Sequence, residues 1–431
     1  MAEERAQAPQ GRRGRALFLA ADLPWPLDGG GRIATYRVLE SLLRRYDVDL
    51  VAMADVDGRP ELGPLATMCR DVRVVRVPFT LGRHRVRQSL SFARSQLSTE
   101  PYRLRKFRSR VFAYEVRDRL DRTSYDLIHC DQFGAFSYVS LASAAIPRVA
   151  AHQNVESDMY RLAGASGGRL RRWLAGREAA RLARAEPRLL AAFDRVLTLA
   201  PEDTELLAAM GIDRVTTLPL PAQQVEAGAP GQPPAGPPRG HRIVSLGSMS
   251  WYGVADGLVW FHDRVLPLVR REVPDVEWQI AGPNAPPAIR RFAGEPGIVL
   301  SGYVDDVDAD LRRARAGIVP LHVAGGVRVK ILRFMEIGLP AVSTSLGARG
   351  LAFADGQGCF RRDDPEGFAA AVVALLVDDA GWLRAAEAGG RYLAASHKRE
   401  GFDAAVDAAL DAAEAHARRR GSGPGGRIPE P

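Results

Sequence analysis

The stretch AGIVPLHVAGGVRVKILRFMEIGLPAVSTSLGARGL, residues 316–351, contains a strand, a turn, a helix and a second strand in that order. An apolar run over residues 317–321 predicts a buried strand. Apolar residues spaced three or four positions apart then predict an amphipathic helix, which a Gly-Leu-Pro sequence ending at Pro340 terminates. The second strand follows over residues 341–344. This order predicts one unit of an α/β domain with a parallel sheet.

A glycine pair precedes this helix and makes its start a candidate ligand site. Gly325 and Gly326 leave backbone N–H groups open to a close approach, and the positive end of the helix dipole favours phosphate there. Arg328 and Lys330 add positive charge at the helix start. The stretch therefore predicts a binding site for a nucleotide diphosphate.

Lysine is rare in this chain, which sets Lys330 apart. Lysine and arginine together number 59, but only Lys106, Lys330 and Lys398 are lysines. A basic position is therefore an arginine by default, so composition alone does not account for Lys330. A lysine ammonium binds phosphate as a compact charge, without the planar fork of arginine. The alternative is an exposed lysine on a helix surface.

Bulk properties describe a two-domain globular protein. The chain has 431 residues, of which 46% are hydrophobic and 26% charged. Three widely spaced cysteines form no CxxC pattern, which argues against zinc and a disulfide framework and favours a reducing cytoplasm. The apolar run over residues 16–21 is too short for a signal sequence or a membrane span. We therefore expect a cytoplasmic protein with no metal site.

Positive charge is concentrated in two segments of the N-terminal half. The formal net charge is +8 overall, and residues 80–122 and 161–188 each carry a large excess of arginine over acidic residues. Such segments could contact an anionic membrane or a phosphorylated acceptor, or form a merely solvated surface. No nucleic-acid-binding motif accompanies them, so nucleic acid is not expected as a partner.

The order of predicted elements indicates two doubly wound halves. The first half starts with a strand, a glycine loop, a helix and a strand, as in a βαβ unit. A Pro- and Gly-rich stretch over residues 218–240 predicts a linker, and a second α/β pattern follows it. The expected divisions are a disordered N-terminus (1–15), an N-terminal Rossmann-like domain (16–217), the linker (218–240), a C-terminal Rossmann-like domain (241–395), a C-terminal helix that crosses back (396–420) and a disordered tail (421–431). Two such domains leave a cleft between them as the expected ligand site.

Several segments carry a resemblance to a known family. They are WPLDGGGRIATYRVLESLLRRYDVDLV, YDLIHCDQF, PRVAAHQNVES, the segment from SLGSMSWYG to WQIAGP, and SGYVDDVDADLRRARAG with the stretch quoted first. Together they resemble the GT-B glycosyltransferases of family 4 (group 1), in the branch associated with bacterial exopolysaccharides. The resemblance implies two Rossmann-like domains that face a cleft. It also implies a metal-independent, retaining transferase that uses a nucleotide-diphosphate sugar as co-substrate and no cofactor.

In the first domain the resemblance implies roles for five residues. Gly30 and Gly31 would admit the donor diphosphate at the helix start, although a tight turn is the alternative. His152 would face the transferred sugar as the catalytic residue. Asn154 and Glu156 would orient the histidine or contact the acceptor, or serve as helix caps.

In the second domain the implied site has a diphosphate part and a nucleoside part. The diphosphate part is Gly247, Ser248, Gly325, Gly326, Arg328 and Lys330. Tyr303 and Val304 lie where such enzymes contact the base through backbone groups.

One departure from the family pattern concerns the ribose. The family commonly carries a Glu-x7-Glu pair, whose positions are Gly325 and Arg333 in this chain. Arginine has no acceptor for a ribose hydroxyl. Glu336, one turn on, could substitute, or it could pair with Arg333 on the helix surface.

The expected function is transfer of a sugar to an acceptor hydroxyl of a glycan, a lipid-linked intermediate or a small natural product. Because of Arg333, the alternative is a non-catalytic relative that acts as an activator or scaffold for a partner transferase. A nicotinamide oxidoreductase is not indicated, because no GxGxxG joins a strand to a helix.

Overall fold

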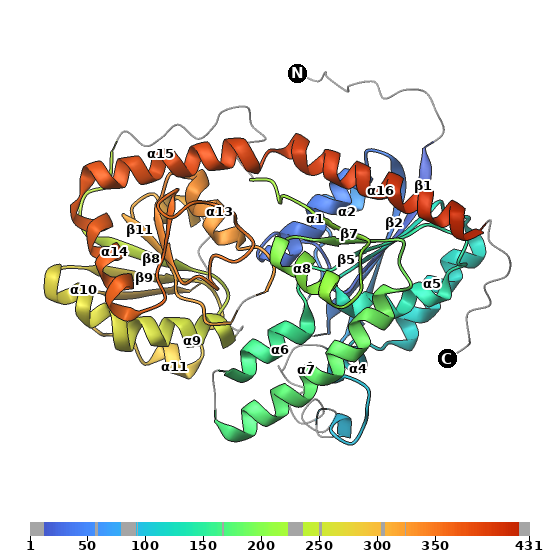
Figure 1. Cartoon of the computed structure of the whole chain (residues 1–431), viewed down its shortest axis with the longest axis horizontal. Helices are drawn as coiled ribbons and strands as arrows, with labels where there is room; N and C mark the ends of the chain where they lie inside the picture. Colours follow the sequence, from blue (N-terminus) through green and yellow to red (C-terminus); the bar gives the residue numbers. More distant parts are fainter. Residues whose placement is uncertain are drawn as a thin grey trace.

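The described strands form two parallel sheets, one from each half of the chain. In this computed structural model, the described residues are 13–56, 59–78, 92, 94–165, 168–222, 236–249, 252–302, 307–323 and 325–421. Figure 1 shows the two sheets side by side, each with helices packed around it. The prediction of a GT-B-like α/β fold with two doubly wound domains is confirmed.

The first sheet has seven strands in the order β3-β2-β1-β4-β5-β6-β7. Its strands are β1 (Gly14–Ala20), β2 (Tyr46–Asp55), β3 (Asp71–Val77), β4 (Leu127–Asp131), β5 (Arg148–Ala151), β6 (Arg195–Thr198) and β7 (Val215–Thr217). The central strand β1 pairs with β2 and β4, so that Phe18 lies opposite Leu50 on one side and His129 on the other. Helices cover both faces of such a sheet, which explains why Phe18 and its neighbours in β1 are buried.

The second sheet has six strands in the order β10-β9-β8-β11-β12-β13. Its strands are β8 (Arg242–Leu246), β9 (Glu277–Ala281), β10 (Ile298–Gly302), β11 (Ala316–Val319), β12 (Ala341–Ser343) and β13 (Cys359–Arg361). Both sheets therefore change direction of winding beside their first strand, between β1 and β4 and between β8 and β11. Ligands bind at the carboxyl ends of the strands at such switch points.

The helices connect these strands and cover the sheets. In the first half they are α1 (Gly30–Leu42), α2 (Leu65–Met68), α4 (Tyr102–Lys106), α5 (Arg110–Arg122), η1 (Phe133–Leu141), α6 (Glu156–Ala165), α7 (Arg169–Leu190) and α8 (Pro201–Ala209). In the second half they are α9 (Tyr252–Trp260), η3 (Phe261–Val265), α10 (Leu266–Glu272), α11 (Pro287–Arg290), α12 (Val307–Leu311), α13 (Val329–Glu336), α14 (Pro365–Val377), α15 (Asp379–Ser396) and α16 (Arg399–Gly421). None of these described helices combines the length and apolar character that a membrane crossing requires.

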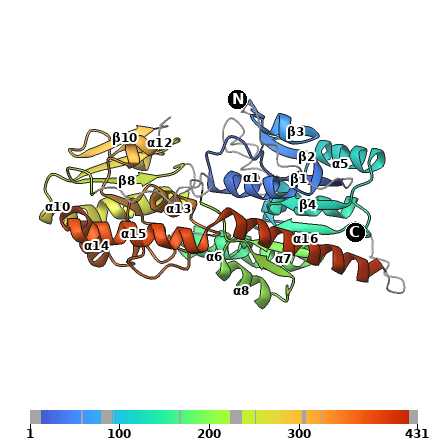
Figure 2. The same cartoon turned by 90° about the horizontal axis from the view of Figure 1, so that it is seen from above.

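The last two helices connect the two halves. Figure 2 shows α15 beside the second sheet and α16 continuing along the first. α16 makes polar contacts with the first domain, where Ser41 of α1 donates to Asp403 at 2.5 Å and Tyr46 of β2 donates to Glu414 at 2.9 Å. The chain therefore returns to its first domain after completing the second.

Candidate functional site

A cavity of about 810 Å³ lies between the two domains at the carboxyl ends of their central strands. The first domain contributes the glycine loop 29–31 and the segment 153–154, and the second contributes Gly247, Ser248 and much of residues 325–336. The structure thus brings together at one cleft most of the residues expected to bind the donor. Two features of the sequence meet there, the start of α1 and the start of α13.

The start of α1 faces the start of α13 at short range. A Cβ atom added to Gly30 would lie 3.1 Å from Cγ2 of Val329, the first residue of α13. A Cβ atom on Gly31 would lie 3.1 Å from Oε1 of Gln153. The N-cap of α1, Gly29, makes no side-chain cap, so no side chain of its own blocks this helix start. Two positive helix ends therefore converge on the cleft.

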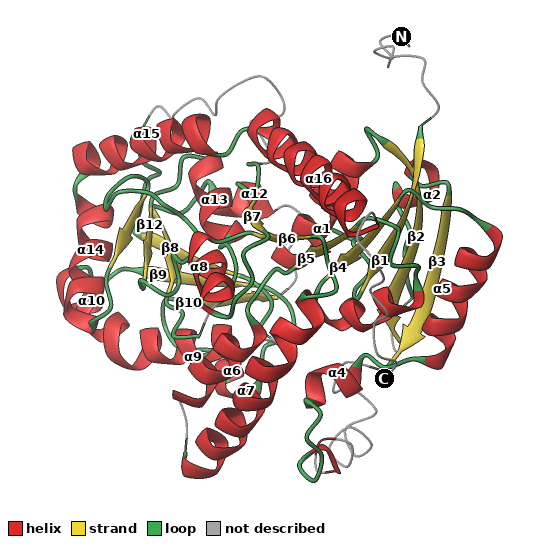
Figure 3. Ribbon diagram, turned by 45° about the vertical axis from the view of Figure 1, so that its right-hand side comes forward, coloured by secondary structure: helices red, strands yellow, loops and turns green. Residues whose placement is uncertain are grey.

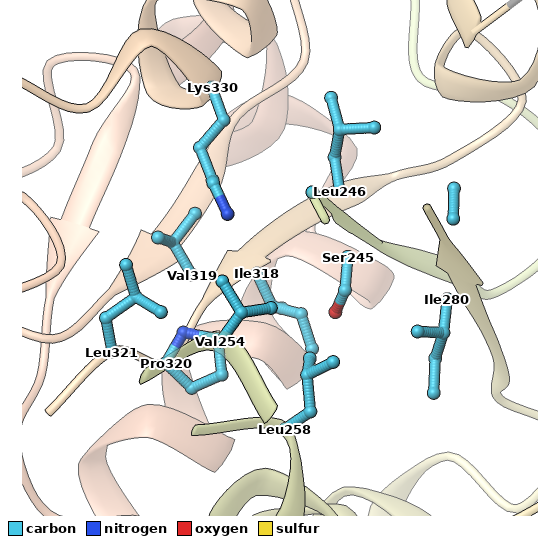
Figure 4. Close-up of a pocket in the computed structure, with 12 residues that line it drawn as sticks. Ser245, Leu246, Val254, Leu258, Ile280, Ile318, Val319, Pro320, Leu321 and Lys330 are labelled. Atoms are coloured by element: carbon cyan, nitrogen blue, oxygen red, sulfur yellow. The ribbon is translucent and has the colours of Figure 1, made fainter. Parts of the chain in front are cut away.

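Lys330 provides a positive side chain at this point of convergence. Figure 4 shows its amine pointing toward Leu246, Val254 and Val319. A Cβ atom on Gly247 would lie 2.8 Å from the Lys330 Nζ, so a residue other than glycine at 247 would displace the amine. Burial first, and the Arg328 charge second, lower the pKa of Lys330 to about 7. Among the described residues, no carboxylate and no hydrogen-bond partner offsets this shift of the Lys330 pKa.

The glycine pair of the second domain, Gly325 and Gly326, forms a close contact with the first domain. The N–H of Gly326 donates to Oδ2 of Asp203 at 3.1 Å, so in this structure that N–H is not available to a phosphate. Gly326 has a φ of +63°, and a Cβ atom there would overlap the carbonyl oxygen of Gln153. A Cβ atom on Gly325 would lie 2.8 Å from Oδ1 of Asn154. Both glycines line the cleft, but close contact between the domains is what requires them.

Buried ion pairs hold the two domains together beside this contact. Arg349 of the second domain donates to Asp158 of α6 at 2.6 Å and to Asp203 of α8 at 2.9 Å. Burial raises the pKa of Asp203, while the Arg349 charge opposes that shift. Arg328 lies near Asp203 and Arg349, and burial lowers the pKa of Arg328 to about 10. Its Nη2 donates to the Gly326 carbonyl at 3.4 Å, so Arg328 supports the turn as well as lining the cleft.

His152 lies at the expected strand end, but its ring is enclosed. The imidazole is 0% exposed and lies against Phe133 and Phe136, with ring centroids 6.0 and 5.3 Å away. Its Nε2 is 3.1 Å from Oε1 of Glu186 in α7. In this structure the ring therefore contacts Glu186 and two phenylalanines, and its expected role toward a sugar stays a prediction. Residue 152 borders a second pocket all the same.

Glu186 accepts hydrogen bonds from several groups at once. Its carboxylate accepts from the backbone N–H of Glu156 at 2.6 Å and of Ser157 at 3.1 Å, and also from the Ser157 hydroxyl. The two backbone N–H groups can only donate, so each oxygen of the Glu186 carboxyl group accepts at least one hydrogen bond. The carboxylate also sits at the N-terminus of α6, where the helix dipole stabilises negative charge. This buried anchor joins the end of β5 to the start of α6.

The second pocket has a volume of about 630 Å³ and borders the first. Asn154 and Glu156, the expected acceptor or orienting residues, both line it. Its charged side chains are paired with one another. Arg103 donates to Glu156 at 3.0 Å, and Arg32 donates to Asp22 at 2.9 Å. Such a mixture of paired charges and amides suits a ligand with several hydroxyl groups.

At the expected nucleoside end, the structure changes one part of the interpretation. Tyr303 and Val304 lie outside the described residues. Glu336 does pair with Arg333, at 2.6 Å, but the expected surface position is wrong, because Glu336 is only 6% exposed. Arg333 also donates to Asp308 through its Nε at 3.1 Å. Asp308 lines the cleft and is a carboxylate that the sequence did not single out.

Metal-binding side chains are not grouped in the part of the chain that the structure describes. No set of three or more His, Cys, Asp or Glu side chains there could hold a metal ion.

Comparisons with known proteins agree with this arrangement. Residues 29–222 match a family model described as a glycosyl transferase 4-like domain, and residues 240–378 match one described as glycosyl transferases group 1. A sequence search among curated proteins finds no match.

Three solved structures illustrate the likeness in fold. Sucrose-phosphate synthase from Thermosynechococcus elongatus is 15% identical with a TM-score of 0.62, covering 95% of this chain and 100% of that chain. HepE of Anabaena in complex with UDP and glucose is 12% identical with a TM-score of 0.58, covering 93% and 100%. A trehalose-phosphate synthase from Burkholderia xenovorans in complex with glucose-6-phosphate is 14% identical with a TM-score of 0.59, covering 93% and 100%.

Proposed function

The chain belongs to the group 1 glycosyltransferases, and from this premise we propose that it moves a sugar from a nucleotide-diphosphate donor to an acceptor hydroxyl with retention of configuration. The observation that carries the proposal is the convergence of two helix N-termini on Lys330, a lysine with no counter-ion among the described residues. A dianionic diphosphate would supply that counter-ion.

The diphosphate site would act by electrostatic stabilisation. As the bond from the sugar anomeric carbon to the diphosphate breaks, negative charge grows on the leaving oxygen. The starts of α1 and α13 and the Lys330 ammonium would stabilise that charge. Since the donor raises the pKa of Lys330, the amine binds a proton when the donor binds.

Retention follows in the proposal from attack on the face that the diphosphate leaves. The acceptor oxygen forms its bond to the anomeric carbon, and its proton passes to an oxygen of the departing diphosphate. Atoms and charges balance without a protein base, a metal or a cofactor. Closure of the domains would align the two substrates and exclude water.

The second pocket would hold the acceptor. Asn154 and Glu156 would bind its hydroxyl groups. His152 and Glu186 would hold the segment that carries them, so His152 acts in this proposal through position. The acceptor is a sugar, a lipid-linked intermediate or a small natural product, and the exopolysaccharide branch stays a prediction. Three free, buried cysteines support the cytoplasm as the compartment.

A nucleotide screen by thermal shift tests the donor site. UDP, GDP, ADP, CMP and dTDP are compared on wild type, Lys330→Ala and the exposed control Lys398→Ala. A nucleotide present at about 100 times its Kd should stabilise the protein by roughly 2.7 kcal/mol. We expect one diphosphate to stabilise wild type and Lys398→Ala but not Lys330→Ala. If no nucleotide stabilises the wild-type protein, the proposal is wrong.

A second candidate function is that of a non-catalytic partner for another transferase. The observation that favours it is Arg333, held between Asp308 and Glu336 where the family usually has a ribose-binding glutamate. Release of nucleoside diphosphate from the matching nucleotide sugar, measured over a panel of acceptors, separates the two. Nucleotide binding with no turnover and a co-purifying transferase would favour the partner role.

A further inference from the structure

The N-terminal part of α7 is an unusually exposed helix surface that is both basic and apolar. Figures 1 and 3 show α6 and α7 extending away from the two sheets, on the side opposite α15 and α16. Residues 168–173 are all exposed, and they include Leu170 at 69% and Trp173 at 58%. We call residues 168–177 the tip of α7.

The positive charge at the tip is unfavourable for the dipole of α7. Its arginines are Arg169, Arg171, Arg172 and Arg177, all of them exposed. No acidic residue occupies the first turn, and the N-cap Gly168 makes no side-chain cap. Positive side chains at a helix N-terminus are unfavourable for the helix dipole. An anionic partner would reverse that disadvantage.

A neighbouring turn extends the same surface. Arg177 and Arg181 donate to the carbonyl oxygen of Gln96, at 2.8 and 3.1 Å, which fixes this turn against α7. Leu97 follows directly and is 93% exposed. The Arg177 guanidinium also lies 5.9 Å from the Trp173 ring. Trp173 and the turn that carries Leu97 therefore both lie beside the same arginine, Arg177.

We infer that this surface docks on an anionic lipid bilayer. Tryptophan and leucine suit the boundary between headgroups and acyl chains, and arginines around them bind lipid phosphates. A folded acidic protein would need a complementary shape, whereas a bilayer needs only this mixture on a projecting end.

Docking in this way would present the acceptor pocket to the membrane. α6 starts at Glu156, which lines that pocket, and runs toward the tip over ten residues, or about 15 Å. Arg103 of α4 lines the same pocket. The acceptor would then be lipid-linked, and this conclusion rests on the proposed sugar transfer. The inference that the surface binds lipid does not rest on it.

Co-sedimentation of the full chain with vesicles tests the inference. Phosphatidylcholine vesicles are compared with vesicles that also contain phosphatidylglycerol, at low and high salt. We expect binding only to the anionic vesicles, weakened by salt. Arg169→Gln and Arg172→Gln should each lower the affinity about fivefold. Leu170→Ala with Trp173→Ala should lower it about tenfold or more.

Matched variants in the second domain serve as controls. Arg384→Gln with Arg391→Gln removes two exposed arginines of α15, and Val299→Ala with Val377→Ala removes two exposed apolar side chains. These should bind vesicles like wild type. Failure of wild type to bind, or equal binding by the tip variants, would overturn the inference. Vesicle binding without any sugar transfer would keep it and reject the transferase proposal instead.

Discussion

The starts of α1 and α13 look alike in sequence but differ in what their glycines do. At α1 the N-cap Gly29 leaves the backbone open, since a Cβ atom there would meet nothing within 4 Å, and Cβ atoms on Gly30 and Gly31 would meet only side chains. At α13 the Gly326 N–H already binds Asp203, and the glycine lies against Gln153. Positive charge comes there from Lys330, one turn later. A glycine-rich helix start can thus open a ligand site or close a domain contact, and only the partners across the cleft distinguish the two.

The largest effect is expected at the domain contact beside α13, on removal of Arg349. Arg349→Met leaves the buried Asp203 without an ion-pair partner among the described residues, whereas Asp158 keeps its second partner Arg161. We expect the free energy of unfolding to fall by about 3 kcal/mol, as for a broken buried ion pair. Urea denaturation of this variant and of the exposed control Arg384→Met measures it. Equal stability of the two variants would show that the domain contact does not depend on these pairs.

The second-largest effect is expected when a side chain is introduced at Gly326. Gly326→Ala puts a Cβ atom into the Gln153 carbonyl oxygen at a φ of +63°, so the turn and Lys330 must move. A displacement of about 1 Å at a reacting site costs about a hundredfold in kcat/KM. Nucleoside diphosphate release measures it, with Gly390→Ala in α15 as control, where a Cβ atom meets nothing within 4 Å. Near-normal activity would mean that the domain contact is not part of the active form.

The pH dependence of donor binding sharpens the role of Lys330. Its pKa in the free protein is lowered to about 7, so the amine is neutral above that pH and must take up a proton to meet the diphosphate. Affinity should therefore be full below pH 7 and decline above it, with the Kd rising about tenfold between pH 6 and 8. Calorimetry with an intact nucleotide sugar measures this, because its diphosphate does not titrate in the range. Lys330→Met should bind weakly and without pH dependence, whereas an unchanged slope would assign the proton to another group.

The smallest effect is expected at the open helix start. Gly30→Ala brings a Cβ atom to 3.1 Å from Val329 Cγ2, a contact that a shift of a few tenths of an ångström relieves. We expect a loss of about threefold in kcat/KM. Shortening the partner in Gly30→Ala with Val329→Ala should recover it. Failure of that rescue would indicate that the Gly30 backbone itself is needed by the ligand.

Local patterns predicted the scaffold of the cleft well. Strand ends, the helix α13 and the rarity of Lys330 were all visible because they depend on neighbouring residues and on composition. The strands β7 and β13 were not predicted, since three-residue edge strands carry little periodicity.

Long-range partners could not be predicted from the sequence. Asp203 is 123 positions from Gly326, and Asp158 is 191 positions from Arg349. Glu186 reads in the sequence as one more polar residue of an arginine-rich helix, although it is buried and holds His152. Nothing local distinguishes such a carboxylate from a solvated one, because burial is decided by how the helices pack.

Because α16 packs against the first domain, it should allow two separate halves of the chain to assemble with each other. Phe402, Val406, Leu410 and Ala413 are buried on this helix, which belongs in sequence to the second half but packs against the first sheet. A chain cut between residues 222 and 236 would yield two fragments, and the second would carry the piece that completes the first. Co-expressed halves should therefore find each other without a fused tether, which would make this scaffold a split reporter in which joining the halves restores the cleft.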